Sequence, residues 1–240
     1  MGASMINSQY TRIDSATVSR CAKIPASILA DVSGRRGALD GRIRALAPDM
    51  RLGGAAFTVE VRPGDNLMIH AALVLAQPGD ILVIDGKNDT AHALMGELMC
   101  AHAAAAGIGG VVIDGAVRDV DTLRKGGIPV FACTFNPNGP TRTQGGRIGH
   151  PISVGGVSVA PGDLVVGDDD GIVVIPRQDA AGLLDAAEEK IRSEQRRMQD
   201  IAEGRLVYGW LEGALKSAGA LPANASLQSL ISQFQANRLG

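Results

Sequence analysis

The sequence predicts an α/β protein built on a mixed β-sheet. Short runs of branched apolar residues, typical of buried strands, lie at 81–84, 111–113 and 164–166, and each ends near an Asp-Gly pair. Alanine-rich helical segments lie at 67–76 and 98–106, so helices and strands alternate in this part of the chain. Segment 128–175 is rich in β-forming residues, which indicates that further strands complete a mixed sheet.

The remaining elements of the first two thirds follow from local patterns. Residues 24–31 predict a helix with Pro25 at a first helical position. Apolar and polar residues alternate over 57–61, which predicts a half-buried strand. The tripeptide Pro-Gly-Asp recurs, and because proline fixes φ and glycine tolerates positive φ, we expect a tight turn at each copy. The copies lie at 63–65, 78–80 and 161–163.

An amphipathic helix is predicted from 180 to about 203. Its apolar stripe consists of Leu184, Ala187, Ile191, Met198 and Ile201. Glu194 falls inside this stripe, where a carboxylate is costly to desolvate unless it is paired or used. The alternative is that Glu194 lies at the solvated edge of a subunit contact. No linker divides the chain, so we expect one domain over 1–240 with a helical tail at 205–240.

Composition excludes several classes of protein. Hydrophobic residues make up 45% of the 240 residues and charged residues 20%, which is typical of a globular chain and not of a disordered one. No apolar run is long enough to span a membrane, and a net charge of −2 argues against a nucleic-acid partner. Cys21, Cys100 and Cys133 are too scattered for a disulfide framework or a Cys-rich zinc site. Because the N-terminus lacks the features of a signal peptide, we expect a cytoplasmic protein.

The densest cluster of candidate functional residues comprises Gly96, Glu97, Leu98, Met99, Arg118 and Asp119. The backbone amides of Leu98 and Met99 fall in the first turn of a predicted helix, where they can bind a carboxylate or phosphate. Arg118 and Asp119 follow a buried strand, at the edge where α/β sheets place ligands. Arginine binds carboxylates in a bidentate manner, and aspartate is a ligand for Mg²⁺ or Mn²⁺. The alternative is that Arg118 and Asp119 cap a helix and pair with surface charges.

The other candidates are weaker. His92 and His102 are ten residues apart, which fits no compact metal motif, and we expect both to be structural. His70 is expected to be a satisfied histidine on a helix. The run 168–170 of three aspartates could hold a metal, but after a strand it is more often a turn. The sequence has no phosphate-binding P-loop, Gly-x-Ser-x-Gly nucleophile motif or His-Glu-x-x-His zinc motif.

Four motifs together resemble the RraA-like family. They are Pro-Gly-Asp-Asn-Leu-Met-Ile-His at 63–70, Gly-Glu-Leu-Met at 96–99, Val-Ile-Asp-Gly-Ala-Val-Arg-Asp-Val at 112–120, and the segment 161–176 that begins Pro-Gly-Asp-Leu-Val-Val-Gly-Asp. The resemblance covers about 25–204. It implies a compact α/β sandwich related to swivelling β/β/α domains, with a C-terminal interface helix. It also implies a homotrimer or homohexamer with its active site between subunits.

The enzymatic branch of that family comprises class II pyruvate aldolases for 4-hydroxy-4-methyl-2-oxoglutarate and 4-carboxy-4-hydroxy-2-oxoadipate. By this resemblance Asp119 would ligate Mg²⁺ or Mn²⁺, and Glu97, where many of these aldolases have Asp, would hold water on the metal. Arg118 would bind the oxygen atoms of the pyruvyl substrate, and the helix start at 96–99 would hold its carboxylate. Glu194 matches an acidic residue that a neighbouring subunit contributes.

The implied reaction is a metal-dependent retro-aldol cleavage of a 4-hydroxy-2-oxo dicarboxylic or tricarboxylic acid to pyruvate and a second 2-oxo acid. Oxaloacetate decarboxylation would be a side activity. With no histidine convincingly placed, water on the metal, tuned by Glu97 and Glu194, is the expected carrier of the hydroxyl proton. The alternatives are a non-enzymatic regulator of a ribonuclease and a dedicated 2-oxo acid decarboxylase. A methyltransferase is disfavoured, because no glycine-rich cofactor loop follows a strand.

Overall fold

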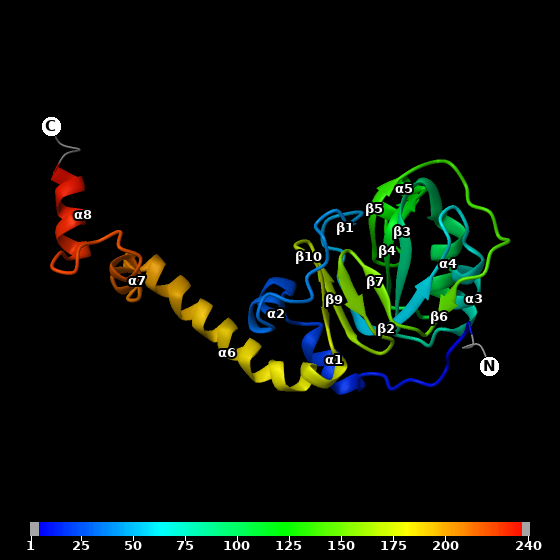
Figure 1. Ribbon diagram of the computed structural model, residues 1–240, viewed down its shortest axis with the longest axis horizontal. Coiled ribbons are helices and arrows are strands. Elements are labelled where there is room, and N and C mark those ends of the chain that lie inside the picture. The colour runs from blue at the N-terminus through cyan, green and yellow to red at the C-terminus, as the bar shows by residue number, and fades with distance from the viewer. Residues whose placement is uncertain (1–4, 237–240) are drawn as a thin grey trace. The chain divides into compact units, whose positions relative to one another are not determined.

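A mixed sheet organises the chain in the computed structural model, which describes residues 5–236 (Figure 1). The strand order is β1-β5-β4-β3-β2-β9-β10, and β6 pairs with β2 outside this path. The strands are β1 (Arg44–Ala45), β2 (Leu52–Glu60), β3 (Ile81–Met95), β4 (Gly110–Val117), β5 (Val130–Phe135), β6 (Arg147–Ile148), β9 (Leu164–Asp168) and β10 (Gly171–Ile175). A separate hairpin joins β7 (Ile152–Val154) to β8 (Val157–Val159).

The sequence prediction of a mixed α/β sheet is confirmed. Strands β2, β3, β4 and β5 are parallel neighbours, whereas β1, β6, β9 and β10 pair in the antiparallel sense. The crossovers between the parallel strands contain helices, as parallel pairing requires. These helices are α3 (Leu67–Leu75), α4 (Glu97–Ala105) and α5 (Val120–Arg124).

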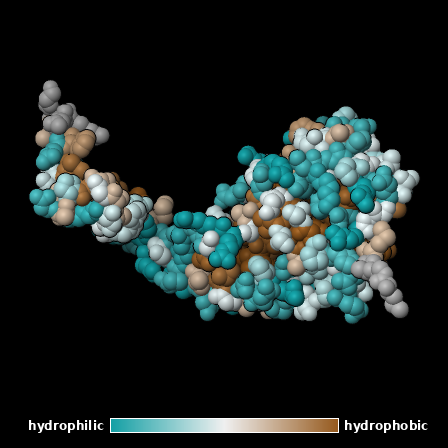
Figure 2. Space-filling model, viewed as in Figure 1, coloured by the Kyte–Doolittle hydropathy of each residue, from teal (hydrophilic) through white to brown (hydrophobic). Residues whose placement is uncertain are grey.

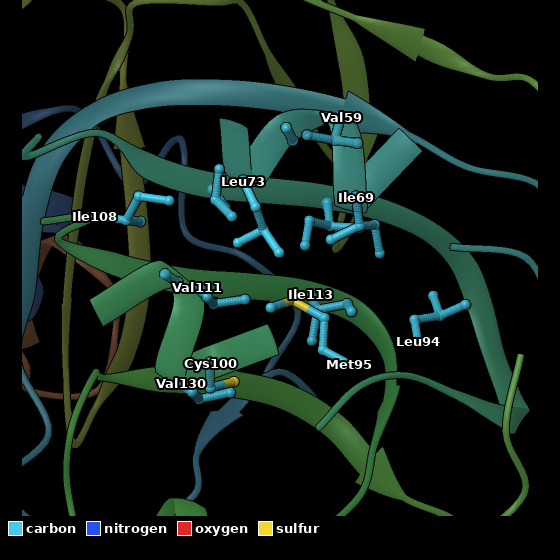
Figure 3. Close-up of a cluster of buried hydrophobic side chains, with 14 of the residues drawn as sticks. Val59, Ile69, Leu73, Leu94, Met95, Cys100, Ile108, Val111, Ile113 and Val130 are labelled. Atoms are coloured by element: carbon cyan, nitrogen blue, oxygen red, sulfur yellow. The ribbon is translucent and has the colours of Figure 1, made fainter. Parts of the chain in front are cut away.

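Both faces of the central sheet are covered. On one face, Ile69 and Leu73 of α3 and Cys100 of α4 share a core with apolar side chains of β2 to β5 (Figure 3). On the other face, the β7–β8 hairpin and the segment 39–46 contribute apolar residues to a second core cluster. The strand predicted at 57–61 is confirmed as far as Glu60, within β2. The prediction that it is half-buried is wrong, because Thr58, on the polar side of the alternation, is as fully buried as Val59.

All three Pro-Gly-Asp tripeptides form turns with a glycine of positive φ. The φ angles of Gly64, Gly79 and Gly162 are 70°, 84° and 84°. Each turn also buries its aspartate, at positions 65, 80 and 163, and each carboxylate accepts at least one backbone N–H. The expectation of a turn at each copy is therefore confirmed, and in each turn a buried aspartate carboxylate accepts a backbone N–H group.

The strands β3 and β4 extend beyond the Asp-Gly pairs at which the sequence predicted they would end. Their regular pairing runs to Ile84 and Ile113, after which the register shifts three times before Met95 pairs with Val117. A side chain at Gly86 could not be accommodated, because its Cβ would lie 2.6 Å from the carbonyl oxygen of Asp114. The polar ends of these strands consequently lie about ten and three residues later than expected, at Gly96 and Arg118.

Two N-terminal helices, α1 (Ser15–Cys21) and α2 (Ala26–Val32), pack with β9, β10 and the first half of α6 (Arg177–Ala202) in a third core cluster. Pro25 is the N-cap of α2, one position before the predicted one. Leu184 and Ala187 of the predicted α6 stripe are buried there. Within the described part of the chain, no helix is both long and apolar enough to cross a membrane.

The chain divides into two compact units, with the boundary between Ile191 and Arg192 inside α6. The second unit contains the end of α6 with α7 (Leu211–Ser217) and α8 (Leu227–Ala236). Large apolar side chains of this unit are exposed: Met198, Leu206, Val207, Trp210 and Phe234. Figure 2 shows hydrophobic colour on the surface of this unit. A single domain over 1–240 stays a prediction.

Candidate active site

The predicted cluster lines a pocket of about 430 Å³ where β3 and β4 end. Gly96 to Met99 form one wall, at the start of α4, and Arg118 and Asp119 follow β4 on another. A hollow of about 460 Å³ lies elsewhere, beside Glu60 and Lys87. There the Glu60 carboxylate is taken up by two cations, with Lys87 Nζ 2.8 Å away and Arg147 as the second partner. The pocket at Asp119 is the better candidate, because it also has the first-turn amides of α4 on one wall.

The backbone at Gly96 and Glu97 lies in close contact with the side chain of Asp119. The Glu97 amide donates a hydrogen bond to Asp119 Oδ2 over 3.0 Å, and Arg118 Nε lies 3.7 Å from the same oxygen. Asp119 has left-handed backbone angles, φ 59° and ψ 37°, a conformation that aspartate tolerates better than most residues. A Cβ at Gly96 would lie 2.4 Å from Asp119 Oδ2, so any larger residue there would displace the Asp119 carboxylate.

The start of α4 presents the amides that the sequence predicted for carboxylate binding. The helix begins at Glu97, and its first internal hydrogen bond runs from the Cys100 amide to the Gly96 carbonyl over 3.0 Å. The Leu98 and Met99 amides therefore precede the helical ladder, where N–H groups have no carbonyl of their own helix to bond. With the Arg118 guanidinium on the same pocket, they form an anion-binding wall.

Asn66 and His70 also line this pocket. Asn66 is not among the residues predicted from the sequence, and the sequence predicts a satisfied helical histidine at His70. Asn66 Nδ2 donates to the Leu94 carbonyl over 2.9 Å, which fixes the amide orientation. Asn66 Oδ1 and His70 Nε2 are buried atoms without a hydrogen-bond partner among residues 5–236. The expectation for His70 is therefore wrong. A signal was present, because residues four apart at a helix start share one face.

The pKa of His70 is lowered from its usual value near 6.5. Burial is the largest cause, and the positive charge of Arg142 and the nearby His102 add to it. A neutral imidazole is favoured because a buried cation loses hydration and is repelled by the guanidinium. The lowered pKa therefore favours the neutral form of His70.

Asp65 fastens the loop that brings Arg142 to the pocket. Its carboxylate accepts hydrogen bonds from Thr141 Oγ1 and the Thr143 amide, both over 2.7 Å, and from the Gln144 amide over 3.1 Å. Burial acts to raise the pKa of Asp65, but these bonds and that of the Leu67 amide outweigh it and lower the pKa to about 2. The carboxylate of the first Pro-Gly-Asp turn thus positions one side of the pocket.

The other residues singled out from the sequence lie elsewhere. Glu194 is exposed on α6 in the second unit, whereas the residues that line the pocket all belong to the first. His92 Nδ1 lies 3.0 Å from Asp89, a structural contact as expected. Asp168 ends β9 and accepts the Ala26 amide over 2.9 Å, in the turn before β10. Within residues 5–236, no three His, Cys, Asp or Glu side chains gather as a metal site.

Comparison with known proteins places this pocket in a family context. Residues 15–174 match the family model for RraA-like proteins, described as Aldolase/RraA. A protein of Halalkalibacterium halodurans, named as a candidate 4-hydroxy-4-methyl-2-oxoglutarate aldolase, is 36% identical over 180 residues. That match covers 75% of this chain and 86% of the relative.

Solved structures show the same fold. An uncharacterized protein from Pseudomonas syringae superimposes with a TM-score of 0.73 at 29% identity, covering 81% of this chain and 96% of that one. A Streptomyces coelicolor protein superimposes with a TM-score of 0.71 at 29% identity, covering 78% and 100%. It is described as RraAS2, an unusual member of the RNase ES inhibitor RraA protein family. One of these relatives is thus named as an aldolase and another as a member of an inhibitor family.

Proposed function

The chain belongs to the RraA-like family, and from this premise we propose that it is a divalent-metal-dependent pyruvate aldolase. It cleaves a 4-hydroxy-2-oxo dicarboxylic or tricarboxylic acid to pyruvate and a second 2-oxo acid, and it decarboxylates oxaloacetate at the same site. The observation that carries this proposal is the pairing of an anion-binding wall with two carboxylates, Glu97 and Asp119, around one pocket.

Substrate binding begins at the anion-binding wall. The Leu98 and Met99 amides hold the carboxylate next to the 2-oxo group, since first-turn amides and the helix dipole both favour an anion. Arg118 donates to the 2-oxo oxygen, where negative charge grows as the C3–C4 bond breaks and pyruvate enolate forms. Because this interaction strengthens as charge develops, Arg118 lowers the barrier and contributes more than binding alone.

The donor set at Asp119 fits a hard divalent cation. Its side chain is 41% exposed, one of its oxygens accepts the Glu97 amide, and Glu97 contributes a second carboxylate to the same pocket. Mg²⁺ usually keeps several waters and takes only one or two protein carboxylates, so a larger ligand cluster is not required. Mg²⁺ or Mn²⁺ held by Asp119, with Glu97 hydrogen-bonding its water, would supply Lewis-acid stabilisation of the enolate.

The role of Glu194 depends on the assembly of several subunits. We place it in the active site of a neighbouring subunit in a homotrimer or homohexamer, as the family resemblance implies. Two observations support an assembly: the apolar stripe of α6 continues to Met198, which is 66% exposed, and Trp210 is 64% exposed in the same unit. An apolar surface of this kind marks an interaction site.

The second candidate function is regulation of a ribonuclease by protein contact, which the name of the Streptomyces coelicolor relative favours. A regulator of that kind has no need of Arg118 and two carboxylates around a pocket. The dedicated decarboxylase is a narrower form of the first proposal, because oxaloacetate cleavage produces the same enolate at the same groups.

The test measures pyruvate release from 4-hydroxy-4-methyl-2-oxoglutarate and from oxaloacetate, with Mg²⁺ and with EDTA. We expect EDTA-sensitive release from both, and loss of both activities in Arg118→Ala and Asp119→Asn. Arg51→Ala, an exposed arginine outside the pocket, is the matched control and should retain activity. Absence of release from either substrate by a folded oligomer would refute the aldolase and leave the regulator.

A further inference from the structure

We propose that His70 is the base that removes the C4-hydroxyl proton of the substrate, and that Asn66 orients that hydroxyl. The proposal rests on the aldolase function above and assigns its proton transfer to the chain itself. Sequence reasoning left this step without a histidine, and the structure supplies one on the α3 side of the pocket.

Two polar atoms at this end of the pocket lack a hydrogen-bond partner among the described residues, and both accept a donor when His70 carries its ring proton on Nδ1. Asn66 Oδ1 can only accept, because the bond from Nδ2 to the Leu94 carbonyl fixes the amide orientation. His70 Nε2 is the second buried atom without a partner in the described chain. Buried polar groups are normally satisfied, so such a pair next to a pocket indicates a bound group that completes them. A substrate hydroxyl carries the required proton.

Only one of the two atoms can keep that proton. An amide oxygen is not basic near neutral pH, whereas a neutral imidazole nitrogen is. The hydroxyl proton is therefore donated to Asn66 or His70 in the bound state and transferred to His70 Nε2 as the reaction proceeds. A general base must lie within hydrogen-bonding reach of the proton it removes. His70 lines the same pocket as the residues that bind the substrate, so it can come within that reach.

The charges around His70 keep it in the basic form before the transfer. Arg142 faces it from the loop at 140–142, and His102 faces it from α4. Arg118, Glu97 and Asp119 line the same pocket from the ends of β4 and β3. A cation at Arg142 disfavours a charged imidazole in the resting enzyme, and an anionic substrate offsets that repulsion when it binds.

The step balances without an added reactant. The hydroxyl proton moves to His70 Nε2, and the O–H electron pair forms the new carbonyl bond of the departing 2-oxo acid. The electrons of the C3–C4 bond pass into the enolate of pyruvate. The imidazolium then returns its proton to C3, which yields pyruvate and restores neutral His70.

Oxaloacetate decarboxylation separates this role from every other role in the pocket. Its C3–C4 bond breaks with loss of carbon dioxide, and no hydroxyl has to be deprotonated. The anion-binding wall, Arg118 and the metal ligands serve both reactions, whereas proton removal by His70 serves only aldol cleavage. After decarboxylation the enolate takes its C3 proton from water. A residue that merely maintains the pocket would affect both reactions alike.

The experiment compares both reactions in His70→Gln and His70→Asn, with His150→Gln as the control, because His150 does not line the pocket. We expect aldol cleavage to fall about 100-fold or more, the range for loss of a general base, with decarboxylation changed less than about threefold. The acid limb of the wild-type aldolase pH profile, below pH 6.5, should be absent from decarboxylation and from both variants.

Equal loss of both activities, or aldol cleavage that survives in both variants, would overturn the assignment. Retained decarboxylation shows in the same sample that a variant is folded and binds its substrate. If the wild-type protein released pyruvate from neither substrate, the aldolase function itself would fail, and that result is visible before any variant is made.

Discussion

Substitution of Gly96 by alanine tests whether the position of Asp119 controls activity. The added Cβ would lie 2.4 Å from Asp119 Oδ2 and 2.9 Å from Arg118 Cγ, whereas ordinary contacts begin near 3.4 Å. The carboxylate must therefore move by about 1 Å. The backbone does not oppose the change, because Gly96 is extended, with φ −157° and ψ −166°.

A displacement of about 1 Å in a reacting group costs on the order of 100-fold in rate, or about 2.7 kcal/mol of transition-state stabilisation. We expect Gly96→Ala to lower kcat/KM for both pyruvate-releasing reactions by that factor. The free energy of unfolding should change by less than about 1 kcal/mol, because the displaced side chains are exposed and can yield.

The assay is steady-state pyruvate release together with urea denaturation. Gly182→Ala is the control: the residue lies inside α6, and a Cβ there meets no neighbouring group within 4 Å in the part of the chain the structure describes. It should keep full activity and gain about 0.5 to 1 kcal/mol of stability, as alanine does for glycine within a helix. A Gly96→Ala enzyme with wild-type activity would refute the reasoning.

Three further predictions concern carboxylates. Asp119→Asn should abolish activity yet unfold at higher urea than Asp119→Ala, because a left-handed backbone costs alanine about 1 to 2 kcal/mol; equal midpoints would contradict this. The pKa of Asp65 is lowered from 3.8 to about 2, so its ionised carboxylate adds about 2 kcal/mol to the free energy of unfolding. This stabilisation is fully present above pH 3.8 and is lost between pH 3.8 and 2. Asp65→Asn should thus be less stable by that amount at pH 7, with a gap from wild type that closes on acidification, and a constant gap would count against it. Glu194→Gln and Asp119→Asn should each be inactive, and mixed oligomers of the two should regain activity, unless Glu194 acts outside a shared site.

Local patterns were sufficient for most of the fold. The turns at Pro-Gly-Asp and the helices at 67–76 and 98–106 depend on neighbouring residues, and the structure places them within one or two positions of the prediction. Burial was harder to predict. The 57–61 strand alternates in polarity, yet Thr58 is buried, because the β7–β8 hairpin nearly a hundred residues later covers its face. The alternation of polar and apolar residues within one strand does not predict this contact with a distant hairpin.

The pocket could be predicted in part. Gly96 to Met99 and Arg118 with Asp119 were selected because helix starts and strand ends have known chemistry, and they do line one pocket. The spacing of Asn66 and His70 indicates a shared helix face, but the neighbouring residues in the sequence do not show that Nε2 lacks a partner. Whether Nε2 has a partner depends on residues of α4 and of the loop at 140–142, which come close to His70 only in the folded protein.

The interrupted pairing of β3 with β4 has a consequence for how this scaffold can change over evolutionary time. The first halves of the two strands pair regularly, whereas the second halves, past the register shifts, lead to the pocket residues Gly96 and Arg118. Leu94, Met95 and Val117 in the second halves are buried in the core, so sequence change that alters substrate preference is confined to the pocket residues that follow the strands. A fold divided in this way can host an inhibitor in one lineage and a lyase in another, since function is decided by a small set of residues on a common frame.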